Sequence, residues 1–260
     1  MNNRKKNSSK LNPSRRFVLV HWNCFHIANR IELLKNYMGK KKPDLVMLNE
    51  IKLDKQMSNF SFDVPGYQAI AKPRKMGGGG VALLIREDLK YFEDRSLDCF
   101  GLELLSIKIK LGNKDIRIIS MYNPPSSKLN EELFRKIKND GSFVLGGDLN
   151  AKHLEFGCSS DNPNGQTLYN IIDEHELVLL NNGEHTHNRF QKKGGSDILD
   201  LFLCSRNLAD KVSNFYVEED NMTSDHFPIV IEMDFCPDRS PGHKVDSFNF
   251  NRANWTRPKT

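Results

Sequence analysis

Four short polar motifs in the sequence carry residue types that could together hydrolyse a phosphate ester. They are Trp22-Asn23, Asn49-Glu50, the stretch GGDLNAKH at 146–153 and the stretch SDH at 224–226. Hydrolysis of a phosphodiester requires an attacking water, an in-line path, neutralisation of the developing charge and help for the leaving oxygen. Carboxylates can bind a divalent cation or activate the water, and histidine can donate a hydrogen bond. The motifs therefore indicate metal-assisted hydrolysis.

The order of the motifs is more specific than any one of them. An acidic residue at a strand end is more often a turn residue or a helix cap than a catalytic group. Six motifs, however, follow one another as VHWNC, LVMLNEIKL, SMYNPP, LGGDLNAKH, SDILDLFLCS and TSDHFPI within residues 17–234. This series resembles the exonuclease-endonuclease-phosphatase superfamily, which contains abasic-site repair endonucleases and pancreatic-type deoxyribonuclease.

The stretch MYNPP at 121–125 narrows the resemblance to nucleic-acid enzymes. Sphingomyelinases, inositol polyphosphate phosphatases and pancreatic-type deoxyribonucleases resemble this pattern with histidine in place of Tyr122, whereas repair and retroelement nucleases carry tyrosine. GGDLNAKH, SDILDLFLCS and the tail segment NFNRANWTR are most similar to non-LTR (LINE-type) retrotransposon endonucleases. The resemblance implies an endonuclease domain that nicks target DNA and leaves a 3′-hydroxyl primer for target-primed reverse transcription.

The resemblance also implies a metal ligand and a water-activating group. Glu50 is expected to bind Mg²⁺, which prefers one or two carboxylates and keeps several waters, and Mn²⁺ can take its place. Asn23 is expected to act as a carbonyl ligand or to bind a phosphate oxygen. Asp148 is expected to orient or deprotonate the attacking water, with Asn150 holding water or phosphate beside it.

A second set of residues is expected to act on the phosphate and the leaving group. His226 would donate to a non-bridging phosphate oxygen, while Asp200 fixes the tautomer of His226 and supports the imidazolium. Asp225 is expected to be an outer carboxylate or a ligand of a second metal. Tyr122 would donate a hydrogen bond to phosphate or to the leaving group.

Further residues are expected to contact DNA, namely His153, Phe25, Lys72, Arg74, Arg189, Lys192 and Lys193. The basic segment 189–195 (RFQKKGG) is expected to form a projecting hairpin that enters or flanks a DNA groove, with an ordinary solvated hairpin as the alternative. His153 has a structural role as its alternative.

Two features depart from the family pattern, one at residues 24–26 and the other at Asn49, where the family usually has glutamine before the glutamate. After Trp22-Asn23 the family usually has a small residue, then Asp or Asn, then Gly, where this chain has Cys24, Phe25 and His26. The change puts a second contribution to metal binding in doubt and leaves Phe25 free to face DNA.

His185 and His187 alternate in a polar stretch, and a solvated loop or strand is favoured over a metal clip because no third ligand of matching spacing is visible.

Short apolar runs must position these motifs. Nine of them predict strands: Phe17 to Trp22, Leu45 to Leu48, Val81 to Ile85, Leu104 to Ile109, Ile116 to Met121, Phe143 to Leu145, Leu177 to Leu180, Ile198 to Leu203 and Ile229 to Met233. The first two are nearly all apolar and should be central strands. Three groups show helical spacing: Ile31, Leu34 and Met38, closed by Gly39; Leu129, Leu133 and Ile137; and Leu168, Ile171 and Ile172. Strands and helices in this proportion, with the resemblance, predict an α/β (α+β) four-layer sandwich like deoxyribonuclease I, in which two face-to-face, mostly antiparallel β-sheets are flanked by helices.

The runs continue from residue 17 to 235 without a linker and predict one endonuclease domain. Residues 1–16 are basic and polar and are expected to form a flexible arm, and residues 236–260 a linker toward an absent reverse transcriptase. Hydrophobic residues make up 38% and charged residues 27% of the 260 residues, which argues against wholesale disorder. Five cysteines without a CxxC pair favour a reducing compartment.

The charge distribution suits a polyanionic partner. The net charge is only +5, but basic residues cluster in segments 4–10, 40–42, 72–75 and 192–193. The expected partners are double-stranded DNA and, within a larger polyprotein, a reverse transcriptase. Synthesis in the cytoplasm followed by entry into the nucleus is expected, and no membrane partner, because no apolar run approaches about 20 residues. An abasic-site DNA repair endonuclease and a catalytically weakened DNA-binding module remain the alternatives.

Overall fold

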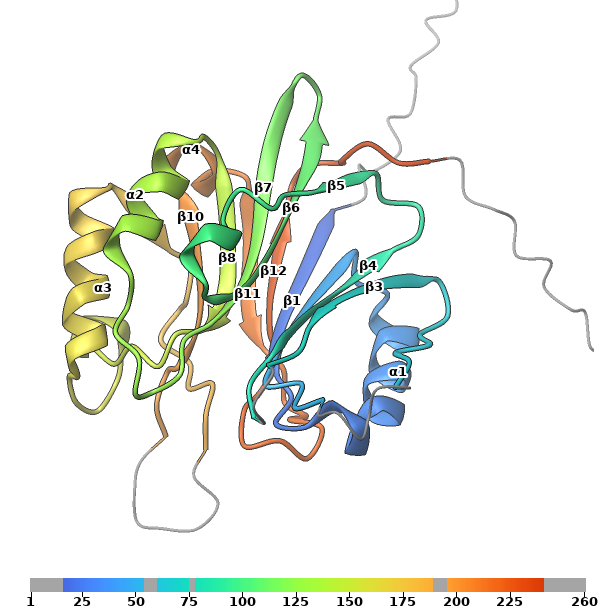
Figure 1. The fold of residues 1–260 in the computed structure, drawn as a ribbon, viewed down its shortest axis with the longest axis horizontal. Helices are drawn as coiled ribbons and strands as arrows, with labels where there is room; N and C mark the ends of the chain where they lie inside the picture. The colour runs from blue at the N-terminus through green and yellow to red at the C-terminus, as the bar shows by residue number, and fades with distance from the viewer. Residues whose placement is uncertain (1–15, 54–59, 75–77, 189–195, 241–260) are drawn as a thin grey trace, which may run out of the picture.

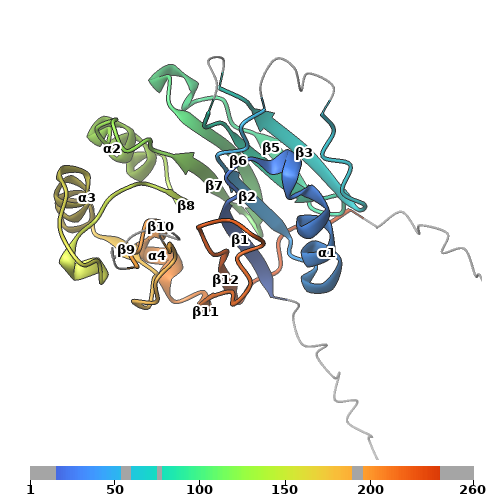
Figure 2. The same cartoon turned by 90° about the horizontal axis from the view of Figure 1, so that it is seen from below.

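The computed structural model describes residues 16–53, 60–74, 78–188 and 196–240 of the chain. Two six-stranded β-sheets pack face to face, and helices lie on the outer side of each (Figures 1 and 2). The first sheet has the order β11 (Val212–Val217), β12 (Ile229–Met233), β1 (Phe17–Asn23), β2 (Leu45–Asn49), β4 (Val81–Arg86) and β3 (Tyr67–Lys72). The second has the order β5 (Tyr91–Glu93), β6 (Glu103–Leu111), β7 (Lys114–Tyr122), β8 (Phe143–Asp148), β10 (Asp200–Ser205) and β9 (Leu177–Leu179).

The pairing of the strands confirms the predicted sandwich. Within the named strands β1 runs parallel to β2 and β7 runs parallel to β8, whereas the other pairs are antiparallel. The nearly all-apolar strands β1 and β2 are central, as their composition predicts, because a strand covered on both faces has no polar side.

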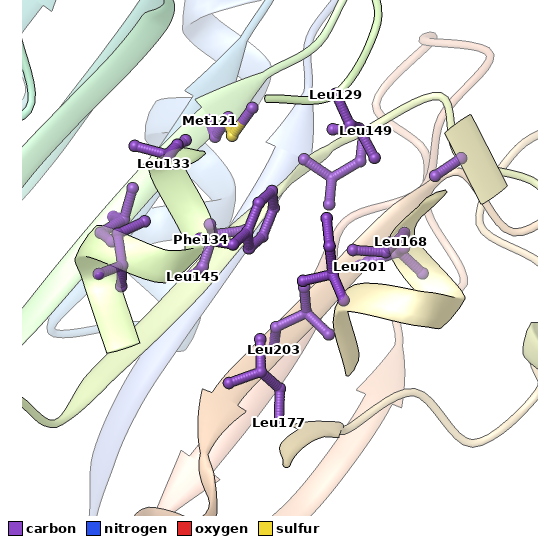
Figure 3. Close-up of a cluster of buried hydrophobic side chains, with 14 of the residues drawn as sticks. Met121, Leu129, Leu133, Phe134, Leu145, Leu149, Leu168, Leu177, Leu201 and Leu203 are labelled. Carbon is purple, nitrogen blue, oxygen red and sulfur yellow. The ribbon is translucent and has the colours of Figure 1, made fainter. Parts of the chain in front are cut away.

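Three apolar clusters hold the layers together. Leu19 and Met47 of the first sheet meet Ile118, Val144 and Phe202 of the second between the sheets. The helix α1 (Ile31–Lys41) packs on the outer face of the first sheet. The helices α2 (Glu131–Asn139) and α3 (Pro163–Glu174) pack on the second, and Figure 3 shows their apolar side chains against it. Burying each such large apolar side chain contributes roughly 1.5–3 kcal/mol.

Local signals in the sequence account for the ends of the helices. The Asn130 side chain accepts a hydrogen bond from the Leu133 amide at 3.1 Å and caps α2, and Asn162 caps α3 through the Gly165 amide at 2.7 Å. The prediction that Gly39 ends the first helix was wrong. The helix continues to Lys41, and Lys42 ends it in the left-handed conformation with φ 51°. Glycine in mid-helix only weakens a helix, so it does not have to stop one.

Two adjacent glycines in β8 allow close approach, Gly146 to the other sheet and Gly147 to the neighbouring strand β7. A Cβ on Gly146 would lie 2.6 Å from the Phe202 ring and 2.7 Å from the Met47 sulfur, which belongs to the other sheet. A Cβ on Gly147 would lie 1.9 Å from the carbonyl oxygen of Met121. The GG of GGDLN is therefore a packing requirement, and it places Asp148 at the end of a closely packed strand.

The described chain continues to be anchored after residue 235, where the linker was expected to begin. Arg239 forms ion pairs with Asp44 at 3.0 Å and with Asp88 at 3.1 Å. The expected flexible arm at residues 1–16 and the rest of the expected linker lie outside the described residues, apart from Arg16 and residues 236–240. Among the described helices, none is long and apolar enough to cross a membrane.

Candidate active site

The topology brings the polar motifs to one end of the sandwich. The parallel strands β1 and β2 finish side by side, with Asn23 opposite Asn49. The parallel strands β7 and β8 finish with Tyr122 opposite Asp148, and the antiparallel β10 begins there, with Asp200 opposite Asp148. Parallel strands end at the same edge, so side chains that lie far apart in the sequence meet there.

Asn49 links the two sheets at this end. Its side-chain oxygen accepts a hydrogen bond from the Asp148 amide at 2.9 Å, and its amide nitrogen donates to the Ser120 hydroxyl at 3.3 Å. Asn49 is fully buried, so both partners satisfy polar groups that would otherwise be costly. This residue, which departs from the glutamine usual in the family, fixes the distance between the two halves of the site.

Glu50 presents its carboxylate to a ring of donors. Its Oε1 accepts hydrogen bonds from the Tyr122 hydroxyl at 2.9 Å and from the Asn23 amide at 3.1 Å, and its Oε2 pairs with the Lys52 ammonium at 2.7 Å. Burial opposes ionisation, but the bonds from Lys52, Asn23 and Tyr122 together hold the pKa of Glu50 below its ordinary value. The carboxylate is therefore ionised, and its side chain is still 15% exposed.

Asp148 is almost completely buried and is held on both oxygens. Its Oδ2 accepts from the Asn23 amide at 2.8 Å, and its Oδ1 accepts from the Asn150 backbone amide at 3.0 Å. Burial, helped by the nearby charge of Asp200 and opposed by His226, raises the pKa of Asp148 to about 7. A carboxyl group with this pKa can accept a proton near neutral pH, which suits a general base.

His226 and Asp200 form a buried pair. The Nδ1 of His226 lies 2.7 Å from Asp200 Oδ2, and its Nε2 lies 3.9 Å from Asp148 Oδ2. Burial disfavours the imidazolium, but the carboxylates of Asp200, Asp148 and Asp225 outweigh it and raise the pKa of His226 to about 10. His226 is therefore charged at neutral pH and can donate from Nε2.

Asp200 has two further partners. The Thr186 hydroxyl donates to its Oδ2 at 2.8 Å, and His21 Nε2 lies 2.9 Å from its Oδ1. Burial opposes the charge of Asp200, but His226 and His21 hold its pKa well below the usual range. Asp200 is thus a fixed anion around which the histidine is oriented.

Hydrogen bonds to β1 position the His226 segment. The Ser224 hydroxyl donates to the Asn23 carbonyl at 2.8 Å, and the Trp22 indole donates to the His226 carbonyl at 3.2 Å. The motifs WN and SDH, which lie about two hundred residues apart in the chain, are therefore joined in one unit.

The donor set at Glu50 fits a hydrated divalent cation. The carboxylate supplies hard oxygens within reach of solvent, and the Lys52 ammonium already places a positive charge on it. The Asn23 amide donates to both Glu50 and Asp148, while its oxygen accepts from the Phe25 amide at 3.1 Å. Asn23 is therefore a bridge between the two carboxylates in this structure, and its oxygen is not directed at Glu50.

Asp225 lies beside a histidine. Its Oδ2 is 3.7 Å from the Nε2 of His187, and its side chain is 33% exposed. The backbone of Asn150 has the left-handed conformation, with φ 47°, and its side-chain amide donates to the Asn123 carbonyl at 3.0 Å. Both residues belong to the same end of the sandwich as Asp148.

Phe25, one of the expected DNA contacts, is exposed at this end of the sandwich. It is 46% exposed, and the Lys52 ammonium lies 3.3 Å from the centre of its ring. Arg74 lies with its guanidinium 5.9 Å from the Tyr122 ring and pairs with Glu103. An exposed aromatic ring beside a cationic group is suited to a nucleic-acid surface.

The other expected contacts are differently placed. His153 is only 7% exposed, and its ring stacks on Tyr169 of α3 with centres 4.5 Å apart. The Lys72 ammonium pairs with Asp98 at 3.4 Å and donates to the Leu102 carbonyl at 3.3 Å. The expected hairpin residues Arg189, Lys192 and Lys193 lie outside the described residues.

Sequence reasoning missed His21, Thr186 and Lys52. The signal for His21 was a histidine inside the otherwise apolar strand FVLVHWN, since a buried polar side chain must have a partner. Thr186 and Lys52 carried no comparable signal. The partner of Thr186, Asp200, lies 14 residues away in the sequence. Lys52 meets Glu50 only because of the backbone conformation of the folded chain.

Comparison with known proteins agrees with the arrangement. A family model described as "Endonuclease-reverse transcriptase" matches residues 116–230. The probable RNA-directed DNA polymerase from transposon BS of Drosophila melanogaster is 24% identical over 86% of this chain and 24% of that protein. The corresponding protein from transposon X-element of the same species is 24% identical over 84% of this chain and 24% of that protein. The chain thus spans about a quarter of the length of these curated relatives.

Solved structures share the fold. The endonuclease domain of TRAS1, a telomere-specific non-LTR retrotransposon, superposes with a TM-score of 0.70 at 17% identity, covering 84% of this chain and 98% of that one. The AP endonuclease LMAP from Leishmania major superposes with a TM-score of 0.73 at 17% identity, covering 92% of each chain. The predicted fold is confirmed. The predicted resemblance is confirmed as a similarity to the endonuclease-reverse transcriptase family model and to the transposon proteins named above.

Proposed function

We propose that this relative of non-LTR retrotransposon endonucleases is a Mg²⁺-dependent DNA endonuclease that nicks target DNA. One observation carries the proposal. Asp148, a carboxyl group with a pKa of about 7, lies beside the imidazolium of His226, which Asp200 holds, and the Asn23 amide bridges Asp148 to the ionised carboxylate of Glu50. Phosphodiester hydrolysis requires these three kinds of group.

The proposed division of labour follows from the protonation states. Asp148 accepts the proton of the attacking water, with its orientation set by Asn23 and the Asn150 amide. His226 donates from Nε2 to a non-bridging phosphate oxygen and neutralises charge that develops there. The Tyr122 hydroxyl stays protonated, because burial and the Glu50 carboxylate raise its pKa, and it can donate a hydrogen bond to the leaving group.

Glu50 is the residue that would hold Mg²⁺, and Mn²⁺ can replace it. When bound, the ion supplies a Lewis acid that stabilises negative charge on the phosphate. Lys52 currently pairs with that carboxylate at 2.7 Å, so it must release Glu50 for the ion. Once released, Lys52 remains beside the exposed Phe25 ring, where it can meet a phosphate of the DNA backbone.

The biological role proposed is target-primed reverse transcription. Hydrolysis that leaves a 3′-hydroxyl provides a primer for a reverse transcriptase, and the curated relatives are RNA-directed DNA polymerases about four times as long as the matched region. The proposal therefore includes double-stranded DNA as substrate, a polyprotein that joins the domain to a reverse transcriptase, and action in the nucleus.

The experiment is a nicking assay on supercoiled plasmid with Mg²⁺, with and without excess EDTA. We compare the parent protein with Asp148→Asn and His226→Gln, which keep side-chain size while removing the base or the cationic donor. Each should lower turnover by at least about 10²-fold. Nicking in EDTA, or either variant within a few-fold of the parent, would contradict the proposal. A parallel synthetic duplex with one abasic site tests the repair alternative, which requires strong preference for that duplex.

A further inference from the structure

Two histidines meet at the edge of the proposed active site. His187 and His226 are partners in an antiparallel β-bridge, and their ring centres lie 4.6 Å apart. Residues directly opposite each other in such a bridge place their side chains on the same face. Backbone bonds from Asn188 to the Asp225 carbonyl at 2.8 Å and from Phe227 to the Thr186 carbonyl at 2.8 Å fix this pairing.

Asp225 completes a three-residue donor set. Ligand atoms of His187, Asp225 and His226 all lie within 4.8 Å of one another. The His187 Nε2 and Asp225 Oδ2 are 3.7 Å apart, which is longer than a good hydrogen bond. Two ligands bound to one ion at about 2.0–2.1 Å each lie at a comparable separation, because their bonds span a tetrahedral angle.

Asp200 orients the His226 ring in the way that a carboxylate commonly orients a histidine that binds a metal. Its Nδ1 is engaged by Asp200 at 2.7 Å, so the ring is fixed and Nε2 is the nitrogen left to face outward. A histidine that binds a metal through one nitrogen commonly gives the other to a carboxylate, which sets the tautomer and raises the basicity of the ligand.

Among the described residues, His187 is buried with one ring nitrogen left without a partner. Its side chain is 10% exposed, the residue as a whole is 8% exposed, and its Nδ1 has no hydrogen-bond partner among the described residues. The other ring nitrogen, Nε2, faces Asp225 Oδ2 at 3.7 Å, so an ion shared by these two atoms would give the buried imidazole a strong partner.

The local charge favours a cation. Asp148, Asp200 and Asp225 surround His226 with three carboxylates. Lys152 is already paired with Asp197, so its charge is not directed at these carboxylates. Carboxylates grouped in this way attract a divalent ion.

We propose that His187, His226 and Asp225 form a binding site for a divalent transition-metal ion, with Zn²⁺ as the preferred class, separate from the Mg²⁺ position at Glu50. Imidazole is a ligand for Zn²⁺ and its neighbours in the transition series, whereas Mg²⁺ prefers oxygen. The donor set of two histidines and one carboxylate matches zinc sites that leave a position for water. The sequence expectation that His187 lies in a solvated stretch without a third ligand is corrected, since Asp225 and His226 supply what sequence spacing could not reveal.

Binding of a metal ion at this site would inhibit nicking of DNA, and this consequence rests on the proposed function. An ion that binds His226 at Nε2 displaces the Nε2 proton of the imidazolium to solvent and occupies the atom that would donate to phosphate. Zn²⁺ should therefore inhibit nicking even when Mg²⁺ is in excess, because the two ions bind different donor sets.

The binding test uses Co²⁺ as a coloured substitute for Zn²⁺ and does not depend on activity. The purified protein is titrated with Co²⁺, the visible absorption of the bound ion is followed, and Zn²⁺ is then added to displace it. We expect saturable absorption in the parent and in His185→Ala, a matched control because His185 is exposed and lies outside the donor set. His187→Ala and Asp225→Asn should each bind at least about tenfold more weakly. Circular dichroism verifies that each variant is folded, and Asp225→Asn serves as the second variant because that side chain is partly exposed.

Equal Co²⁺ binding by the parent and both ligand variants, or no saturable binding by the parent, would overturn the site. A second arm measures the Zn²⁺ concentration that halves each protein's own nicking activity in Mg²⁺. That concentration should rise at least about tenfold in His187→Ala but not in His185→Ala. If no protein nicks DNA, the proposed function fails, while the Co²⁺ titration still decides whether the site exists.

Discussion

Replacing Asp200 by asparagine should move the pH profile of nicking downward while leaving the fold intact. Asparagine keeps the shape of the side chain and can still accept from His226, but it removes the buried charge that lies 2.7 Å from Nδ1. At an effective dielectric constant of about 20, unit charges about 4 Å apart interact with roughly 4 kcal/mol. At about 1.4 kcal/mol for each pKa unit, that is roughly three units.

Both limbs of the profile should respond in the same direction. In the parent, the alkaline limb reflects loss of the His226 imidazolium, whose pKa is raised to about 10. Without the Asp200 charge the imidazolium is lost at lower pH, so this limb should fall by about two to three units. The acid limb reflects ionisation of Asp148, whose pKa of about 7 is raised by burial and in part by Asp200, so it should also move down. Maximal turnover should fall by at least about 10²-fold.

The measurement is initial nicking rate against pH for parent, Asp200→Asn and Asp197→Asn. Asp197 is a matched control, because it is also buried but pairs with Lys152 and Ser159 and has no bond to His226. The control should keep the parental profile. Proton NMR titration of the His226 ring without metal gives an independent value. An alkaline limb that stays at its parental position in Asp200→Asn would refute the assigned pairing.

Three further predictions concern the metal ligand, the packing of glycines and the basic segment 189–195. Glu50→Ala should abolish Mg²⁺-dependent nicking with little change in thermal unfolding, because a partly exposed carboxylate leaves no core cavity; retained nicking would contradict its role. Gly147→Ala should lower the stability by about 1–3 kcal/mol or prevent folding, whereas Gly39→Ala, where nothing lies within 4 Å, should raise it by roughly 0.5–1 kcal/mol; equal melting temperatures would contradict the packing argument. Replacing both Lys192 and Lys193 by alanine should flatten the slope of log affinity against log salt by up to about two units if both touch phosphate, and an unchanged slope would mean that neither does.

The central strands could be predicted from the sequence, and three strands at the edges of the sheets could not. β3, β5 and β11 each lie at the end of a sheet and bury their side chains only in part. An edge strand contacts one neighbour and faces solvent, so it lacks the apolar run that identifies a strand. The sheets themselves were predictable because the buried strands contain almost nothing but apolar residues.

The site was predictable as a set of motifs but not as a set of contacts. Glu50, Asp148 and His226 belong to motifs whose order is informative. The three-way environment of Asp200, with His21 and Thr186 as well as His226, depends on register across two sheets, which sequence spacing does not encode. The burial of His153 against α3 likewise follows from packing and could not be read from its motif.

The chemistry of the nick tests the central claim most directly. Supercoiled plasmid is incubated with the protein and Mg²⁺, and the nicked product is given to a DNA polymerase and labelled nucleotides without any prior end repair. The proposed function, a nick that leaves a 3′-hydroxyl, predicts immediate extension from the nick and a 5′-phosphate on the other end. Nicked DNA that is extended only after removal of a 3′-phosphate would contradict the account.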